Sequence, residues 1–356
     1  MKIHNFSAGP SILPQSVFDK AAKGVLNLDG SGLSILEISH RSKDFVEIHE
    51  KAKRLVKELL HVPDTHQILF LSGGASSQFF MTPLNCLPQN GKASYVDTGS
   101  WSSKAIKEAR RYGEIDILAS SKEAGYNYIP KGYTVPQDAV YLHLTSNNTI
   151  YGTQYHQFPD CTNPLVCDMS SDIFSRPVDV SRFGIIYAGA QKNMGPAGVT
   201  LVIVREDMLG KVERDIPSML DYRIHIKGDS MYNTPPVFPI YVSMLTLEWL
   251  GEQGGVAAIE ERNKEKAAIL YKEIDRNPLF TGVAVDEDRS LMNVTFLVKD
   301  ESMQAPFLEM CKNAGCDGVK GHRSVGGFRA SIYNAMPKEG IETLVEVMQQ
   351  FEKQKG

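Results

Sequence analysis

The sequence predicts an α/β fold: a large domain with a mostly parallel, seven-stranded sheet, followed by a smaller C-terminal α+β domain. Three observations predict it. Short apolar runs alternate with amphipathic helical patterns over the first two hundred residues. Several of these runs are apolar throughout, as expected of strands whose two faces are both covered. Beyond residue 250 the order changes to long helix, strand, helix and strand, which is typical of a second, smaller unit.

Seven apolar runs are expected to form the strands of the large sheet. In chain order they are residues 67–71, 93–96, 115–118, 139–144, 164–167, 185–188 and 199–204. Helical patterns separate several of them. Residues 44–60 repeat apolar side chains at the spacing of one helix face. Residues 102–113, SSKAIKEARRYG, begin with serines suited to capping a helix and end on a glycine.

The second half of the chain predicts the boundary between two domains. A helix over residues 240–250 leads into GEQGG, a plausible hinge. Then follow, in order, a helix over 257–277, a strand over 291–298, a helix over 305–315 and a strand over 328–334. We therefore expect a large domain over residues 16–250 and a small domain over residues 251–356.

Composition and charge exclude several classes of function. The net charge of −4 gives no reason to expect nucleic acid as a partner. No apolar run approaches the length of a membrane span, and the opening MKIHNFSAGP lacks the apolar core of a secretory signal. The five cysteines are scattered and predict neither a disulfide framework nor a metal site. We therefore expect a cytoplasmic protein that acts on small molecules and holds no metal.

Unusual polar residues follow five of the predicted strands. SGGASSQF comes after the first strand and is expected to open a helix near residues 76–77. Trp101 is expected on the loop after the second strand, and Thr149 follows the fourth. Asp168 follows the fifth strand and Lys192 the sixth. Each residue alone is more often structural, but strands of an open α/β sheet bring their carboxyl ends together at a ligand site.

These residue types indicate a particular chemistry. A lysine removed from water has a lowered pKa and forms Schiff bases with carbonyl compounds. Glycines at a helix N-terminus let the backbone approach a phosphate, and Trp101 is suited to stack on a flat ring. Pyridoxal 5′-phosphate requires a held phosphate, a stacked ring and an acid beside its ring nitrogen. We therefore expect this cofactor, with Lys192 forming the Schiff base.

Eight segments resemble the class V aminotransferases, in particular those that act on phosphoserine. The resemblance runs through nearly the whole chain, and the last four segments together are highly specific. The segments are NFSAGP (5–10), EISHRSKDF (37–45), SGGASSQF (72–79), SNNTIYG (146–152), DMSSDIFSRPVD (168–179), YAGAQKNMGPAG (187–198), MYNTPP (231–236) and GHRSVGGFRASIYNA (321–335). The resemblance implies the type I fold of pyridoxal-phosphate enzymes, with residues 1–15 packing near the active site and the small domain.

The resemblance also implies a role for each site residue. Lys192 is the Schiff-base lysine, Asp168 pairs with the pyridine nitrogen, and Trp101 lies against the ring. Thr149 lies near the phenolic oxygen of the ring. The cofactor phosphate is met by Ala75, Ser76 and Gln191, and by Asn233 and Thr234 of a second subunit. The substrate α-carboxylate is bound by Arg329, and the distal anion by Arg41, His322 and Arg323.

The implied reaction interconverts O-phospho-L-serine and 2-oxoglutarate with 3-phosphooxypyruvate and glutamate, in serine biosynthesis. A phosphorylated threonine analogue, used in pyridoxine biosynthesis, is a further substrate that the family makes possible. The implied assembly is a homodimer with shared active sites. Two departures from the family pattern affect the details. Ala8 stands where some members have serine, and Ser76 stands where some have arginine.

Three alternatives remain open from the sequence. A cysteine desulfurase is the nearest, because Cys311 and Cys316 lie at about the right distance after Lys192, but they fall on a helical pattern and its end, without a serine-rich loop. A catalytically silent protein with the same fold is the second. A Schiff-base lyase that works without pyridoxal phosphate is the third.

Overall fold

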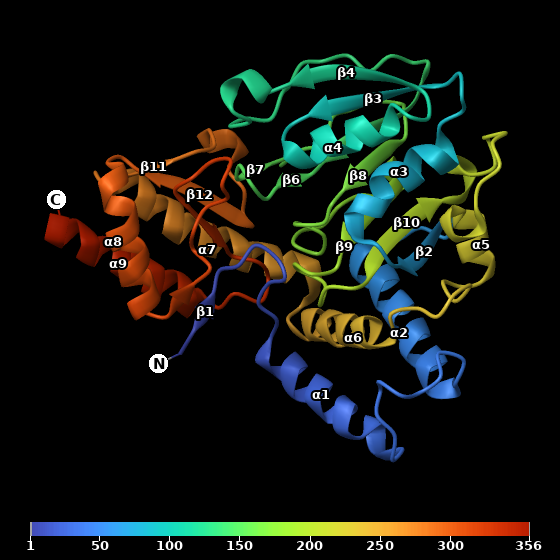
Figure 1. The fold of residues 1–356 in the computed structure, drawn as a ribbon, viewed down its shortest axis with the longest axis horizontal. Coiled ribbons are helices and arrows are strands. Elements are labelled where there is room, and N and C mark those ends of the chain that lie inside the picture. The colour runs from blue at the N-terminus through green and yellow to red at the C-terminus, as the bar shows by residue number, and fades with distance from the viewer. Residues whose placement is uncertain (1, 356) are drawn as a thin grey trace.

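The computed structural model describes residues 2–355, and its centre is a seven-stranded sheet (Figure 1). The strands lie in the order β2-β10-β9-β8-β5-β3-β4. Their bounds are β2 (His66–Leu71), β3 (Lys92–Asp97), β4 (Glu114–Ser120), β5 (Ala139–Thr145), β8 (Leu165–Asp168), β9 (Phe183–Gly189) and β10 (Thr200–Arg205). Strand β10 is antiparallel to both of its neighbours, whereas the other pairs are parallel. All seven predicted strands are confirmed, and so is the mostly parallel sheet.

Both faces of the sheet are buried, which explains the uninterrupted apolar runs. In β2, Ile68 and Phe70 pack into the core on one face, and Leu69 and Leu71 pack into the core on the other. The helices that cover the first face are α1 (Gln15–Leu26), α2 (Lys43–Leu60) and α6 (Val237–Glu252). The helices on the second face are α3 (Gly74–Cys86), α4 (Ser100–Ala109) and α5 (Tyr222–Lys227).

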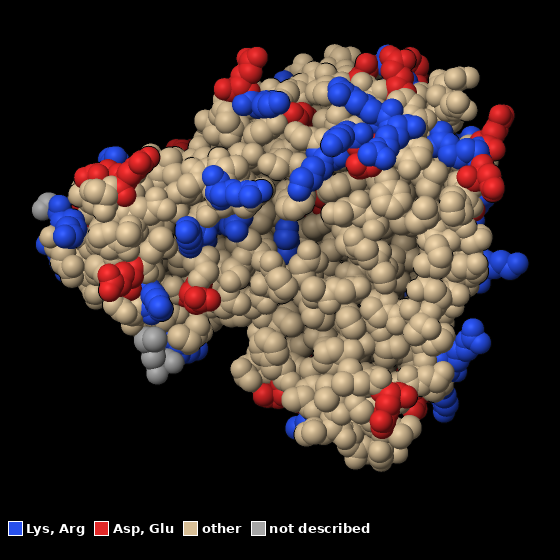
Figure 2. All heavy atoms as spheres, in the orientation of Figure 1, with Lys and Arg blue, Asp and Glu red and all other residues tan. Residues whose placement is uncertain are grey.

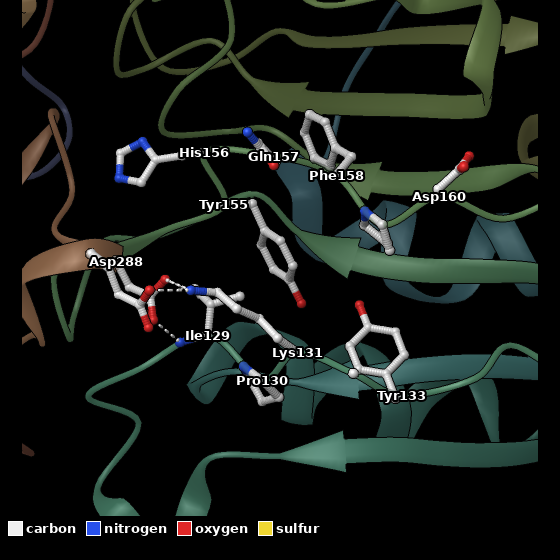
Figure 3. Close-up of a pocket in the computed structure, with 13 residues that line it drawn as sticks. Ile129, Pro130, Lys131, Tyr133, Tyr155, His156, Gln157, Phe158, Asp160 and Asp288 are labelled. Carbon is white, nitrogen blue, oxygen red and sulfur yellow. Dashed lines mark hydrogen bonds and ion pairs between the residues drawn. The ribbon is translucent and has the colours of Figure 1, made fainter.

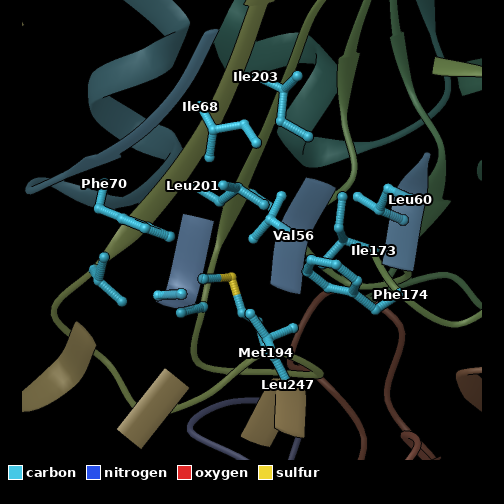
Figure 4. Close-up of a cluster of buried hydrophobic side chains, with 14 of the residues drawn as sticks. Val56, Leu60, Ile68, Phe70, Ile173, Phe174, Met194, Leu201, Ile203 and Leu247 are labelled. Atoms are coloured by element: carbon cyan, nitrogen blue, oxygen red, sulfur yellow. The ribbon is translucent and has the colours of Figure 1, made fainter. Parts of the chain in front are cut away.

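Figure 4 shows part of the core on the first face. Val56 of α2 lies beside Leu201 of β10, with Ile68 of β2 nearby, whereas Leu60 of α2 lies beside Ile173. Leu247 of α6 also belongs to this cluster. The spacing of the apolar residues in residues 44–60 therefore did identify the buried face of α2. This packing supports the sheet beneath the strand ends that carry the candidate site.

The C-terminal part of the chain has its own core, centred on a three-stranded antiparallel sheet. Its strands are β11 (Phe280–Gly282), β12 (Asn293–Val298) and β14 (Phe328–Ser331), and its helices are α7 (Gly255–Arg276), α8 (Gln304–Asn313) and α9 (Lys338–Lys355). The N-terminal strand β1 (His4–Asn5) pairs in parallel with β13 (Cys316–Asp317). The remaining hairpin joins β6 (Asn147–Asn148) and β7 (Thr153–Gln154).

The separate cores support the division expected from the sequence. We propose that residues 16–250 form a large domain and residues 251–356 a small one, with residue 356 lying outside the described range. The segment over residues 1–15, described from residue 2, joins the two. Its strand β1 pairs with β13, and Ser11 then donates hydrogen bonds to the backbone carbonyls of Gln191 and Lys192, at 3.0 and 2.7 Å.

The structure corrects three local predictions. Helix α4 begins at Ser100 and ends at Ala109, before the glycine expected to end it. Its cap is Gly99, and Ser102 lies within the first turn, where its Oγ accepts hydrogen bonds from the backbone N–H groups of Thr98 and Gly99, each at 2.9 Å. Trp101 therefore lies in the first turn of a helix and not on a loop. Helix α3 begins at Gly74, two residues before the predicted start.

Candidate active site

A cavity of about 470 Å³ opens where the carboxyl ends of the parallel strands meet, between the sheet and the small domain. Its lining includes residues from each of the five strand ends singled out in the sequence: the start of α3, α4, the ends of β5 and β8, and the loop after β9. The N-terminal segment, the loop of His322 and strand β14 complete it. The lining residues are Ala8, Gly9, Gly73, Gly74, Ala75, Ser76, Trp101, Thr145, Asn147, Thr149, Ile150, Asp168, Ser170, Ser171, Gln191, Lys192, His322 and Arg329. The predicted gathering of polar groups at one edge of the sheet is confirmed.

Lys192 and Thr149 meet in this cavity. The Lys192 Nζ donates a hydrogen bond to Thr149 Oγ1 at 2.8 Å. Lys192 follows β9, which is buried along its whole length, so its ammonium group leaves the core directly into the cavity. Burial lowers the pKa of Lys192 to about 8, while the nearby Asp168 carboxylate opposes this shift and Arg329 adds to it. The lysine is therefore tuned toward a reactive neutral amine.

Asp168 ends β8 on the floor of the same cavity and is only 5% exposed. Its Oδ1 accepts a hydrogen bond from the backbone N–H of Ser170 at 2.9 Å. Burial raises the pKa of Asp168, and the hydrogen bonds from Ser170 and the charge of Lys192 act in the opposite direction. A buried carboxylate of this kind is best satisfied by a cationic N–H in the cavity.

The start of α3 forms an anion cradle. The first residues of a helix have backbone N–H groups without an intrahelical acceptor, and here those of Ala75 and Ser76 lie at the cavity. The turn before them needs glycine: Gly73 and Gly74 have φ of 97° and 67°. A Cβ on Gly73 would also lie 1.9 Å from Ser77 Oγ. The glycines noticed in the sequence therefore shape the turn that exposes these N–H groups.

Three residues of the cavity, Trp101, Thr145 and Arg329, have buried polar side-chain atoms without a hydrogen-bond partner in the described chain. Trp101 Nε1 and Arg329 Nε are both inaccessible and make no hydrogen bond within residues 2–355. Arg329 Nη1 donates only a long bond of 3.3 Å to the Thr149 carbonyl, and no described carboxylate pairs with its guanidinium. Burial lowers the pKa of Arg329. An unpaired, half-buried guanidinium is costly, and a bound carboxylate would relieve that cost.

Positive charge surrounds the mouth of the cavity. His322 lines it, and burial together with the charges of Arg329, Arg323 and Lys104 lowers the pKa of His322. Figure 2 shows Lys and Arg side chains gathered around a hollow on this face of the molecule. The site is therefore suited to substrates with more than one negative group.

The structure does not bring every predicted site residue to this cavity. Arg323 is exposed beside His322 but does not line the cavity, and Arg41 is exposed elsewhere on the chain. Asn233 and Thr234 lie on the segment before α6, where Asn233 Nδ2 donates to the Thr234 carbonyl at 3.0 Å. Asn233 borders a different, smaller cavity next to Gly73. Within one chain, Arg41, Asn233 and Thr234 thus make no direct contribution to the cavity.

Sequence reasoning also missed several lining residues. Thr145 lies beside Asp168 in the sheet register, and its buried Oγ1 has no hydrogen-bond partner in the described chain. Ser171 donates to the carbonyl of Asn147 at 3.0 Å and so braces the cavity wall. The sequence does carry a signal for these residues, since Thr145 opens the polar stretch at the end of β5 and Ser171 lies in the one that follows β8.

A second cavity, of about 550 Å³, is larger but has different chemistry (Figure 3). Aromatic rings line it, among them Tyr133, Tyr155 and Phe158. Its one lysine, Lys131, is held in ion pairs with Glu287 at 3.0 Å and Asp288 at 3.1 Å. It has neither an unpaired cation nor a helix N-terminus among its lining residues. The smaller cavity around Lys192 is therefore the candidate active site.

Comparison with known proteins shows the family of the chain. The family model described as aminotransferase class-V matches residues 3–344. The chain is 61% identical to the phosphoserine aminotransferase of Flavobacterium psychrophilum over 353 residues, which is 99% of each chain. It is 59% identical to that of Parabacteroides distasonis, over 99% of this chain and all of the relative. The chain belongs to the class V aminotransferase family.

Solved structures extend the likeness to three dimensions. The phosphoserine aminotransferase from Bacillus circulans subsp. alkalophilus is 44% identical to this chain and superposes on it with a TM-score of 0.97. The match covers 100% of this chain and 99% of the other. A phosphoserine aminotransferase from Trichomonas vaginalis, described as bound to pyridoxal phosphate, is 40% identical with a TM-score of 0.92, over 98% of this chain and all of the other. The predicted fold of pyridoxal-phosphate enzymes is therefore confirmed.

Proposed function

We propose that this enzyme is an aminotransferase that uses pyridoxal 5′-phosphate to interconvert O-phospho-L-serine and 2-oxoglutarate with 3-phosphooxypyruvate and glutamate. The observation that supports it best is the convergence of Lys192, Asp168 and the unpaired Arg329 on one cavity. The near relatives that bear the name phosphoserine aminotransferase match almost the full chain. Serine biosynthesis is the role that this activity serves.

The cavity residues fit the cofactor. Pyridoxal phosphate has a phosphate, a flat ring, a ring nitrogen and an aldehyde, and each has a suitable partner here. The exposed N–H groups at the start of α3, with Ser76 and Gln191, suit the phosphate. Trp101 provides a flat face, and the buried Asp168 carboxylate suits a protonated ring nitrogen. Lys192 provides the amine. The cavity also holds the orphaned Thr145 hydroxyl, which a polar ligand group would satisfy.

When bound, pyridoxal phosphate supplies a carbonyl that takes up the amino group and a ring that withdraws electrons from the substrate Cα. The chain supplies the rest. Lys192 Nζ accepts the proton from the substrate Cα and returns one during amino transfer. Asp168 holds a proton on the ring nitrogen, because its buried carboxylate favours a cationic partner. The Thr149 hydroxyl, 2.8 Å from Lys192 Nζ, orients the amine.

The lowered pKa of Lys192 matters for this role. With a pKa of about 8, about a quarter of the lysine is neutral at pH 7.5. At the ordinary value of 10.5, only about one molecule in a thousand would be neutral at that pH. Burial of the side chain in the cavity therefore increases the reactive fraction by a factor of about 200.

The charges at the cavity select the substrate. Arg329 is half-buried without an acid partner, so we assign it to the α-carboxylate that both amino-acid substrates share. His322 and Arg323 stand at the mouth and are assigned to the distal group, which is a phosphate in one substrate and a carboxylate in the other. A loose cluster of donors accepts both groups more readily than a tight pocket would.

The alternative of a cysteine desulfurase receives no support from the site. Cys311 and Cys316 are buried in the core of the C-terminal part and do not line the cavity. Burial raises the pKa of both thiols, that of Cys316 to about 11. A silent protein and a lyase without cofactor are separated from our proposal by experiment. The purified protein should be yellow, and should form glutamate from phosphoserine and 2-oxoglutarate. Colourless protein, or no glutamate, would contradict the proposal.

We also propose that the enzyme is a homodimer with shared sites. Arg41, Asn233 and Thr234 are absent from the cavity of their own chain, which supports a role toward a second copy. Large apolar side chains near them are exposed, including Leu36 at 62% and Tyr232 at 49%. The five cysteines are unpaired thiols, in keeping with the cytoplasmic location expected from the sequence.

Mixing two inactive variants tests the shared site. Lys192→Ala and Arg41→Ala are each expected to be nearly inactive as homodimers. In a mixed dimer one site collects both changes and the other collects neither, so random mixing should restore about a quarter of wild-type activity. Tagged pull-down would confirm that mixed dimers formed. If they form and activity does not return, Arg41 acts within its own subunit.

A further inference from the structure

Lys104 is a cation at the mouth of the cavity that the roles above do not use. It lies in α4, one turn after Trp101, and its Nζ is 4.3 Å from the centroid of the Trp101 ring. Trp101 lines the cavity, and it packs against the same small apolar cluster as Val325, which lies in the loop of His322 and Arg323. Lys104 is therefore held on the side of α4 that faces the substrate entrance.

The charge of Lys104 is not neutralised by the protein. Among the ion pairs formed by residues 2–355 none involves Lys104, whereas Lys92 of the large sheet, which is partly buried, pairs with Glu114 and Asp116. Its one defined contact is the ring of Trp101, and a cation over an aromatic face keeps its full charge. The field of Lys104 also reaches His322, where it adds to those of Arg323 and Arg329.

We propose that Lys104 is a further specificity-determining residue, which attracts the distal anion of the substrate and favours a phosphate over a carboxylate. The inference rests on the proposed function. Its physical basis is that Coulomb attraction is proportional to the charge of the ligand. A phosphate monoester carries close to two negative charges at neutral pH, whereas the γ-carboxylate of glutamate carries one. Lys104 therefore contributes about twice the binding free energy to phosphoserine.

This proportionality predicts a measurable relation between two substrates. If Lys104→Gln lowers kcat/KM for glutamate about threefold, it should lower kcat/KM for phosphoserine by the square of that factor, about ninefold. The effect should appear mainly in KM, because Lys104 is placed at the entrance. Lys104→Arg should restore most of it. Added salt should shrink the difference between wild type and Lys104→Gln, since Lys104 is exposed.

Lys107 provides a matched control. It lies in the same helix, is exposed, and pairs with no described carboxylate, but it has no contact with Trp101. Lys107→Gln also removes one positive charge, and it should leave kcat/KM unchanged for both substrates. The inference is overturned if the two variants have the same kinetics, or if Lys104→Gln lowers kcat/KM for both substrates by the same factor. A changed cofactor absorbance with a loss of kcat would also overturn it, because Lys104 would then act by positioning Trp101.

The same assay separates this inference from the proposed function. If the wild-type enzyme does not convert phosphoserine at all, the proposed function fails. If the wild type converts phosphoserine and Lys104→Gln has the same kcat/KM as the wild type for both substrates, only the proposed role of Lys104 fails.

Discussion

Replacing Arg329 by glutamine should weaken the binding of every amino-acid substrate, while the folded variant should be at least as stable as the wild type. In the structure, the Arg329 guanidinium is half-buried, its Nε has no partner, and burial lowers its pKa. Nothing in the described chain neutralises it. The charge therefore costs folding free energy that a bound carboxylate recovers, and glutamine removes both the cost and the benefit.

The magnitude follows from the bond that is lost. A hydrogen bond between charged groups contributes about 1.5–3 kcal/mol, which corresponds to a loss of about 10-fold to 160-fold in affinity. Because both phosphoserine and glutamate carry the α-carboxylate, their losses should be equal. The long bond of 3.3 Å to the Thr149 carbonyl contributes little, so its removal should not lower stability appreciably.

Two assays together test this reasoning. Steady-state kinetics should show a higher KM for phosphoserine and for glutamate in Arg329→Gln, by the same factor. Thermal unfolding without substrate should show an unchanged or higher Tm. A lower Tm with unchanged KM would refute the reasoning, because Arg329 would then hold the structure together. If KM rose by different factors for the two substrates, Arg329 would be assigned to the distal anion and not to the α-carboxylate.

Four further outcomes are expected. Lys192→Ala should abolish multiple turnover and the visible absorbance of the bound cofactor, and an unchanged spectrum would contradict the assignment. Asp168→Asn should still bind pyridoxal phosphate but lose most of its rate, so wild-type turnover would identify a different acid. Arg323→Ala should lower kcat/KM for both phosphoserine and glutamate and leave any residual activity with alanine unchanged. An equal fall in the activity with alanine would show that Arg323 has a structural role. The rate at which cofactor-free enzyme reacts with pyridoxal phosphate should rise with pH and be half-maximal near pH 8, because only neutral Lys192 reacts; a midpoint near the ordinary lysine value would contradict the lowered pKa.

The large sheet was predictable because its physical cause is visible in the sequence. Strands buried on both faces must be apolar throughout, and Leu69 and Phe70 show why, since neighbours along β2 enter different cores. The end of β9 was equally visible: an apolar run followed by Lys192 and small residues marks a strand that delivers a lysine to a cavity. Sequence alone thus indicated the edge of the sheet at which the cavity lies, and that Lys192 lies there.

Features that depend on distant neighbours were not predictable in the same way. The serines after Trp101 are the caps that the sequence predicts, whereas in the structure Gly99 is the cap of α4, and the Oγ of Ser102 in the first turn accepts a hydrogen bond from the Gly99 N–H. Local sequence does not distinguish these two uses of serine. The unpaired Thr145 hydroxyl became visible only once β5 and β8 were placed side by side. The roles of Asn233 and Thr234 depend on a second chain and stay a prediction.

A comparison of amino donors tests the central claim most directly. The enzyme, loaded with pyridoxal phosphate and given 2-oxoglutarate, would be supplied in turn with phosphoserine, serine, alanine and cysteine, and glutamate formation measured. The cationic mouth and the unpaired Arg329 predict a high kcat/KM for phosphoserine and very low values for donors without a distal anion. Serine or alanine reacting as well as phosphoserine, or cysteine losing its sulfur, would contradict the account.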